Sequence, residues 1–175
     1  MPVSDQGIHR DRYMLIPRTL VFLRREHEVL LIKGAAHKRL WANRYNGVGG
    51  HIEPGEDVYQ AAERELFEET GLRARSLRLC GVLTIAGPAA TPPTGVGVFV
   101  FRGDLGPQEG ALLSAAPSDE GSVEWAPIER VYELPLVEDL HQLLPRVLQA
   151  KADEPPFSAH YTYDTAGNLQ IFWRH

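Results

Sequence analysis

The sequence contains one cysteine, Cys80, so no disulfide can form within the chain. Cys80 lies in an apolar run, and we interpret it as a core thiol that suits the reducing environment of the cytoplasm. No stretch of ~18 apolar residues is present, as a membrane-spanning helix would require. Residues 1–11 are polar and lack the apolar stretch of a signal peptide. We therefore expect a cytoplasmic protein that does not act at a membrane.

Positive charge is also scarce in this chain. It has 18 Lys and Arg against 23 Asp and Glu, which gives a formal net charge of −5. A broad surface for nucleic acid is normally basic, so this balance argues against a nucleic acid polymer as the partner. A single nucleotide is still compatible, because a bound metal ion can supply the positive charge that phosphates attract.

The 175 residues are enough for one domain with a full core. We expect a mobile tail over residues 1–12 and a single domain over residues 13–175. The β-prone stretches predict strands, and a closing hairpin, over 13–23, 29–33, 76–85, 96–102, 123–126, 160–163 and 169–173. Helical spacing predicts helices over 57–70 and 136–148, and Pro145 predicts a kink or a late start in the second. This order is typical of an α+β fold with a mixed sheet between two helices.

The helix expected over residues 57–70 carries a concentration of acids. At roughly 100° per residue, Glu65 and Glu69 share the face of the helix that its apolar residues mark as inward, and Glu68 lies at the edge of that face. A carboxylate taken out of water without a partner is costly, so this face requires a cation. Mg²⁺ or Mn²⁺, which prefer oxygen ligands, would satisfy it. The alternative is a solvated acidic face with Arg64 as its counter-charge.

A glycine-rich segment over residues 46–56 leads into this helix. Its glycines allow the backbone to adopt positive φ and to approach a ligand closely. Pro54 and Gly55 predict a tight turn just before the helix begins. A glycine-rich loop followed by an acidic helix favours a metal-dependent site over the solvated alternative.

Residues 50–72 match the signature of the Nudix hydrolase family without a departure. The signature is Gly, five residues, Glu, seven residues, Arg-Glu, an aliphatic residue, any residue, Glu-Glu, any residue, Gly and an aliphatic residue. Its fixed positions are Gly50, Glu56, Arg64, Glu65, Leu66, Glu68, Glu69, Gly71 and Leu72. The resemblance implies an α/β/α sandwich that hydrolyses a nucleoside diphosphate linked to another moiety, with Mg²⁺ or Mn²⁺ as cofactor.

The family pattern also implies roles for single residues. Metal ligands would come from Gly50 (its carbonyl), Glu65, Glu68 and Glu69. Glu68 would be either a further ligand or the base that orients the attacking water. Glu56 and Arg64 would pair and hold the loop against the helix.

Looser matches extend to the oxidised purine nucleoside triphosphatase group of the same family. They are the segments 46–50, 118–120 before Trp125, 136–139 and 157–173. In that group the residue before the glycines reads the base, which is Asn46 in this chain. A later acid reaches the metal, which is Glu120 here, and an acidic pair before the last helix reads the purine edge. That pair is Glu138 and Asp139, which could equally be first-turn acids of their helix.

Two positions depart from that group: Tyr45 and Leu136 stand where tryptophan is common. Cations precede the glycine-rich segment, and we expect Lys33 or Lys38 to contact the polyphosphate. The alternative is a solvated basic loop.

The resemblance implies hydrolysis of a nucleoside triphosphate to a nucleoside monophosphate and pyrophosphate, with 8-oxo-dGTP or another modified dNTP as the candidate substrate. Two alternatives stay open at this point. One is hydrolysis of another nucleoside diphosphate derivative, such as a diadenosine polyphosphate or ADP-ribose. The other is a non-catalytic nucleotide-sensing module, although such modules usually lose a signature Glu and this chain keeps all of them. In each case we expect a nucleotide as the partner and a monomer or homodimer as the assembly.

Overall fold

The computed structural model describes residues 2–7, 9, 11–38, 40–88, 93–106 and 121–174. Its strands are β1 (Met14–Arg25), β2 (Glu28–Gly34), β3 (Tyr45–Asn46), β4 (Leu77–Ala86), β5 (Thr94–Leu105), β6 (Gly121–Pro127), β7 (Phe157–Tyr163) and β8 (Leu169–Arg174). Its helices are α1 (Val58–Thr70) and α2 (Leu140–Gln149), with short 3-10 turns η1 (Val3–Gln6) and η2 (Ile128–Glu133). Within the described ranges, no helix combines the length and the apolar character needed to cross a membrane.

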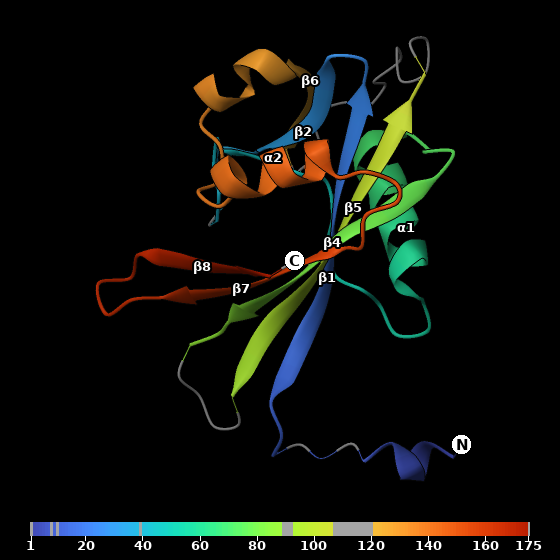
Figure 1. The fold of residues 1–175 in the computed structure, drawn as a ribbon, viewed down its shortest axis with the longest axis vertical. Helices are drawn as coiled ribbons and strands as arrows, with labels where there is room; N and C mark the ends of the chain where they lie inside the picture. Colours follow the sequence, from blue (N-terminus) through green and yellow to red (C-terminus); the bar gives the residue numbers. More distant parts are fainter. Residues whose placement is uncertain are drawn as a thin grey trace.

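The strands form one mixed sheet in the order β3-β2-β1-β5-β4-β7-β8, with β6 paired to β2 (Figure 1). β1 and β5 run parallel along their whole lengths, whereas β1 pairs with β2 only at its last residues, Arg24 and Arg25. The other edge of β1 is bridged to the segment before α1, at Arg18 with His51 and at Val21 with Val48. The glycine-rich segment therefore runs along β1, near the middle of the sheet.

The two helices cover opposite faces of this sheet (Figure 1). On the α1 side, Val21 and Leu23 of β1 pack in a cluster with Leu66. On the α2 side, Phe22 packs in a second cluster with Leu140. This alternation along β1 produces one core on each face, and the predicted α/β/α sandwich is confirmed.

The second helix starts later than its apolar spacing, which runs from Leu136, indicates. Leu136 instead forms a bridge with Tyr45, and the N–H of Val137 donates to the Tyr45 carbonyl at 2.9 Å. This extended pairing with β3 takes the backbone groups that a helix would use, so α2 begins at Leu140. Pro145 lies inside α2, whose late start agrees with one of the two outcomes predicted for that proline.

The C-terminal end of α2 is tied to the sheet by two arginines. Arg102 of β5 donates from Nη1 to the carbonyls of Leu148 at 3.1 Å and Ala150 at 2.9 Å. Arg78 of β4 donates to the Ala150 carbonyl at 2.6 Å and also to Lys151. Cations there satisfy carbonyls that the helix leaves unpaired. They fix the position of α2, and with it the residues that precede the helix.

Candidate functional site

The register of α1 is set by a cap at each end. Asp57 accepts from the N–H groups of Tyr59 at 2.8 Å and Gln60 at 2.9 Å, while the Gln60 side chain accepts from the Asp57 N–H at 2.8 Å. This reciprocal pair is a capping box. At the other end Gly71 has a φ of 70° and donates to the Phe67 carbonyl at 2.8 Å. The predicted start and stop of the helix are confirmed, so the acids between them have fixed positions.

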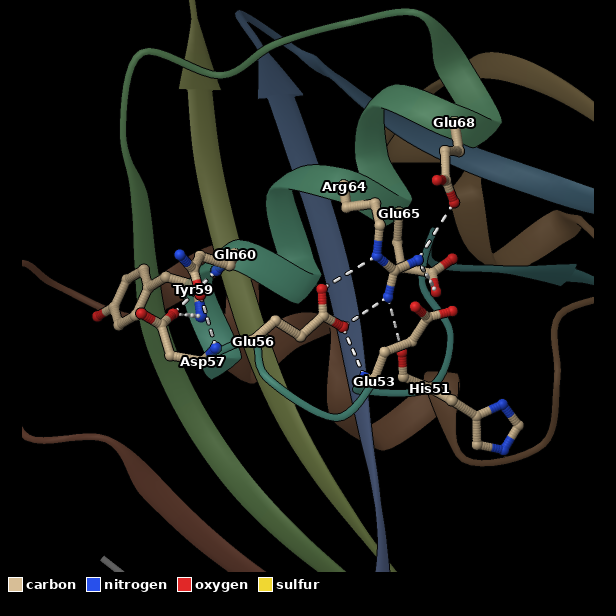
Figure 2. Close-up of polar contacts among 9 residues, drawn as sticks. All are labelled: His51, Glu53, Glu56, Asp57, Tyr59, Gln60, Arg64, Glu65 and Glu68. Carbon is tan, nitrogen blue, oxygen red and sulfur yellow. Dashed lines mark hydrogen bonds and ion pairs between the residues drawn. The ribbon is translucent and has the colours of Figure 1, made fainter.

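Arg64 holds the acids of this region together, as Figure 2 shows. Its guanidinium binds Glu56 through two nitrogens, with Nη2 at 2.7 Å and Nε at 3.1 Å from the carboxylate oxygens. Nη1 of the same side chain donates to Glu65 at 2.8 Å and Glu68 at 3.2 Å. Nη2 also donates to the carbonyl of His51 at 3.0 Å. One cation thus joins α1 to the loop that precedes it.

The glycine-rich loop closes over the other acids. The N–H of Gly49 donates to Glu69 at 3.0 Å. A methyl group at Gly50 would collide with the carboxylate of Glu65, so glycine is required for this close approach. The carbonyl of Gly50 accepts from the N–H of Thr19 at 2.9 Å, which leaves it one lone pair.

The exposed fractions of Glu65, Glu68 and Glu69 differ in the way that the helical spacing predicted. The side chain of Glu65 is 15% exposed and Glu69 is half-buried, whereas Glu68 is 57% exposed. Glu65 and Glu69 therefore face inward toward the loop, and Glu68 faces water at the edge.

The donors present fit a divalent cation. Carboxylate oxygens of Glu65 and Glu68 already converge on one positively charged atom, Nη1 of Arg64, and hard cations prefer such oxygens. As the side chains stand, no three acidic, His or Cys side chains in the described ranges surround a common point. Instead, the N–H of Gly49 binds an oxygen of Glu69, and the guanidinium of Arg64 binds an oxygen of Glu65. Glu120, the acid predicted to reach the metal from a later loop, lies outside the described residues.

The ion pair between Glu56 and Arg64 shifts both groups toward their charged forms. Hydrogen bonds from Arg64, and then from the Glu53 N–H, hold the pKa of Glu56 below its usual range. The bonds to Glu56, and then to Glu65, raise the pKa of Arg64. Both groups are therefore charged at neutral pH.

A pocket of about 470 Å³ opens beside this acid cluster. Its apolar floor consists of Leu83 and Ile85 of β4 with Val96 and Val98 of β5. That volume is typical of a small-molecule site. Gly49 lines the pocket and also bonds Glu69, so the pocket and the acid cluster meet at this residue.

The three predicted base-reading residues all line the pocket. The side-chain oxygen of Asn46 accepts from the Gly47 N–H at 2.8 Å, which leaves the amide nitrogen to donate to a ligand. Glu138 is exposed. Burial, and then the neighbouring charge of Glu138, raises the pKa of Asp139. Asn46 therefore offers donors to the pocket, and the two acids follow the segment that pairs with β3 beside it.

The lysines predicted to contact the polyphosphate, Lys33 and Lys38, do not line this pocket, and their contact with the polyphosphate stays a prediction. The ammonium of Lys33 lies 5.6 Å from the ring centroid of Tyr45. Tyr45 is buried, and burial together with a hydrogen bond to Glu124 raises its pKa to about 12.

Several residues that line the pocket were not predicted from the sequence as site residues, among them Arg18, Trp41, Arg44 and Tyr161. Arg18 had a detectable signal, because it is a charge within an apolar, β-prone run. Trp41 is 45% exposed and adopts a φ of 59°, so it presents an aromatic surface from the loop after β2. No sequence pattern marks Tyr161 as a pocket residue, because its place in the pocket depends on the pairing of β7 with β4.

Tyr161 is 2% exposed, and its hydroxyl is buried without a hydrogen bond of ordinary geometry within the described residues. It nevertheless lies close enough to Asp139 that burial, followed by the charge of that carboxyl, raises the pKa of Tyr161. The Oγ1 of Thr19, also at the pocket, is likewise buried and lacks a partner among the described residues.

Comparison with known proteins places this arrangement in a family. The NUDIX domain model matches residues 14–147. The chain is 34% identical to the oxidized purine nucleoside triphosphate hydrolase of Danio rerio over 113 residues, which is 65% of this chain and 67% of that protein. It is 41% identical over 71 residues to the NAD-capped RNA hydrolase NudC of Haemophilus influenzae, which is 39% of this chain and only 26% of NudC. The matched region thus spans about a quarter of that relative's length.

The fold agrees with these matches. The crystal structure of the MutT protein from Bacillus halodurans has a TM-score of 0.73 and 22% identity, covering 91% of this chain and 97% of that one. The family match includes the acid cluster and most of the pocket, and it ends before β7 and β8, which complete the pocket wall. The chain therefore belongs to the Nudix hydrolase family.

Proposed function

We propose that this chain hydrolyses a phosphoanhydride bond of a nucleoside triphosphate, releasing a nucleoside monophosphate and pyrophosphate. The observation that carries the proposal is the position of Gly49, which lines the pocket and bonds Glu69 of the acid cluster. A nucleoside held in the pocket would extend its phosphates past Gly49 toward Glu65. The glycine has no side chain to obstruct that path.

The acid cluster supplies the proposed ligands and base. Glu65, Glu69 and the Gly50 carbonyl would hold Mg²⁺ or Mn²⁺, and Glu120 would add a further oxygen. When bound, the metal neutralises phosphate oxygens and lowers the pKa of a bound water. Glu68 is the proposed base, because it is the exposed member and water reaches it directly.

The remaining residues of the cluster hold these groups in place. Arg64 binds Glu65 and Glu68 through the same nitrogen, which limits the directions that both carboxylates can take. Glu56 fixes that guanidinium through two hydrogen bonds. Such supporting contacts commonly orient the groups that touch metal or substrate.

The proposed substrate is a modified purine dNTP, with 8-oxo-dGTP as the first candidate. The relative from Danio rerio is named for oxidized purine nucleoside triphosphates, and it supports this choice. The amide nitrogen of Asn46 would donate to a carbonyl or ring nitrogen of the base. Glu138 and Asp139 would bind the opposite edge, where a purine carries N–H groups. Trp41 supplies an aromatic surface for stacking, which Leu136 in the core does not provide.

The test is a product assay with Mg²⁺ on a panel of nucleotides. The panel contains 8-oxo-dGTP, the ordinary dNTPs and NTPs, a diadenosine polyphosphate and ADP-ribose. We expect pyrophosphate release with a preference for 8-oxo-dGTP, and loss of that preference in Asn46→Ala. Gln149→Ala is the control, since Gln149 is an exposed amide side chain of α2 outside the pocket lining.

Other outcomes would contradict specific parts of the proposal. Equal rates on all triphosphates would remove the base-reading roles and keep the hydrolase. Turnover only of the diadenosine polyphosphate or ADP-ribose would replace the substrate and keep the acid cluster. Tight nucleotide binding without release of any product would make the chain a sensor.

A further inference from the structure

We propose that Arg18 binds the phosphate group attached to the nucleoside, and this assignment rests on the function proposed above. Arg18 lies on β1 and lines the pocket. Side chains alternate along a strand, so Arg18 points to the same face of the sheet as Leu20 and Phe22, which belong to the α2-side cluster. It therefore faces the pocket rather than α1.

The neighbours of Arg18 within the sheet are apolar. Val98 of β5 lies directly opposite it, and Leu83 of β4 lies opposite Val98. Both belong to the floor of the pocket. The apolar neighbours on the floor offer no hydrogen-bond acceptor to the guanidinium of Arg18. The residue is nevertheless half-buried.

The side chain of Arg18 makes no hydrogen bond or ion pair with any residue in the part of the chain that the structure describes. Arg24, on the same strand outside the pocket, and Arg44, at the pocket, differ in this respect. Arg24 binds Asp104 at 2.8 Å, and Arg44 donates to the Leu136 carbonyl at 3.2 Å. A partly buried charge without a partner is unfavourable. An anionic group on a ligand would remove that cost.

The register of the loop indicates which part of the ligand this is. Thr19 is bonded to Gly50, and the next pair along the strand is Arg18 with His51. Gly50 is the residue whose Cα lies against the carboxylate of Glu65. Arg18 is thus one residue along β1 from Thr19, the partner of Gly50, and Gly50 follows Gly49, where the pocket meets the acid cluster. The first charged group that a nucleotide would bring to that point is the phosphate on its ribose.

The chemistry of arginine suits this position. Its planar guanidinium offers paired N–H donors that match two oxygens of a phosphate. The acids Glu138 and Asp139 are unsuitable for a phosphate and come from the segment before α2, whereas Arg18 comes from β1. The pocket therefore has separate sites for the base and for the first phosphate, and Arg18 selects nucleotides over nucleosides.

The experiment is calorimetric titration with dGMP and with deoxyguanosine, in EDTA so that no metal contributes. Arg18→Met should weaken dGMP binding roughly 10- to 100-fold, as loss of a charge-assisted hydrogen bond does, and leave deoxyguanosine binding unchanged. Arg18→Lys should recover part of the loss, because it keeps the charge but not the paired donors. Arg24→Met is the matched control from the same strand and should bind both ligands as the wild type does. If Arg18→Met does not fold by circular dichroism, Arg18→Gln carries the same test.

Three results would overturn the assignment. Equal losses for dGMP and deoxyguanosine would place Arg18 at the base. Unchanged binding of dGMP in a folded Arg18→Met would show that no contact exists. Failure of the wild type to bind dGMP would remove the phosphate site altogether.

The assignment and the proposed function can fail separately. A wild type that binds dGMP through Arg18 and yet hydrolyses no member of the nucleotide panel would keep the phosphate site and lose the hydrolase. A wild type that releases pyrophosphate, with dGMP binding insensitive to Arg18, would lose only the phosphate site.

Discussion

The acid cluster and the adjoining pocket are built in opposite ways. In the cluster, Glu56, Glu65 and Glu68 all accept from Arg64, and Glu69 accepts from the Gly49 N–H. At the pocket, the side chains of Arg18, Thr19 and Tyr161 have no hydrogen bond of ordinary geometry to a described residue. Most buried polar groups in proteins are bonded, and each exception requires an explanation. The acidic groups of the cluster are bonded to the protein itself, whereas these three side chains of the pocket are not bonded to its described residues.

The difference has a consequence for stability. Bonds within the cluster stabilise the fold and position the proposed catalytic groups at the same time, so a change that breaks those bonds should affect both. An unpaired hydroxyl in the pocket stabilises nothing until a ligand arrives, so its removal should affect binding alone. Substitutions in the two regions should therefore give different combinations of activity and stability.

Glu69→Gln should produce the largest effect on activity. The Gln side chain keeps an oxygen that can accept from the Gly49 N–H, so the loop should stay in place, while the negative charge needed by a metal is lost. We expect kcat/KM for 8-oxo-dGTP to fall by roughly 10²-fold or more, with a thermal midpoint near that of the wild type. Steady-state pyrophosphate release and circular dichroism melting measure the two quantities.

Glu63→Gln is the matched control for this variant. Glu63 lies on the same helix and is exposed, away from the loop. It should lose the same charge without any loss of rate. A Glu69→Gln enzyme with near-normal turnover would show that Glu69 holds no metal.

The same contrast explains what the sequence could and could not predict. The acids of α1 lie within five positions of one another, so helical spacing alone placed Glu65 and Glu69 inward, and Asp57 and Gly71 marked the helix ends. The pocket instead combines residues of β1, the loop after β2, β4, β5, the segment before α2 and the closing hairpin. No local sequence pattern shows that these segments meet, and Trp41 and Tyr161 were missed for this reason.

Some predictions depended on tertiary contacts that the sequence does not show. The apolar spacing from Leu136 did not give the start of α2, because Leu136 and Val137 pair with β3. The choice of Lys33 and Lys38 followed their nearness in sequence to the glycines. Lys33 lies over Tyr45 and outside the pocket, and a contact of either lysine with the polyphosphate stays a prediction. The cytoplasmic location and the oligomeric state, a monomer or a homodimer, stay predictions.

Arg64→Met should produce the next largest effect, because it releases Glu56, Glu65 and Glu68 together. Supporting residues of this kind typically contribute 10- to 100-fold, so we expect kcat/KM to fall by roughly that factor. Unlike Glu69→Gln, this variant should also unfold at a lower temperature. Arg73→Met on the segment after α1 is the control, since the Arg73 guanidinium lies 4.2 Å from the centroid of the Phe67 ring and outside the cluster.

The stability lost in Arg64→Met should depend on pH in a defined direction. The pKa of Glu56 is lowered in the folded protein by its bond to Arg64. A carboxyl of this kind contributes stability above its unfolded pKa of roughly 4.3, and the contribution is lost as the pH falls through the lower folded pKa. The difference in free energy of unfolding between wild type and variant should therefore be full at pH 7 and shrink below about pH 4. Urea titrations across this range measure it, and a difference independent of pH would exclude Glu56 as the main partner.

Tyr161→Phe should give the smallest effect, and it should change the KM without lowering the thermal midpoint. It removes one hydroxyl that is buried beside Asp139, and the ring can keep its packing. Because that hydroxyl has no bond of ordinary geometry to break, the thermal midpoint should be unchanged or higher. The KM for the nucleotide should rise by roughly 2- to 10-fold, the usual worth of one hydrogen bond to a ligand. Tyr132→Phe, at an exposed tyrosine outside the pocket lining, should change neither quantity.

A lower thermal midpoint in Tyr161→Phe with an unchanged KM would reverse this conclusion. It would mean that the hydroxyl and Asp139 stabilise each other in the protein without ligand, as the groups of the acid cluster do. The polar groups of Tyr161 and Asp139 would then bind each other and not the ligand. The ligand would be left to Arg18 and Asn46, whose amide nitrogen is free of the Gly47 bond that holds its oxygen.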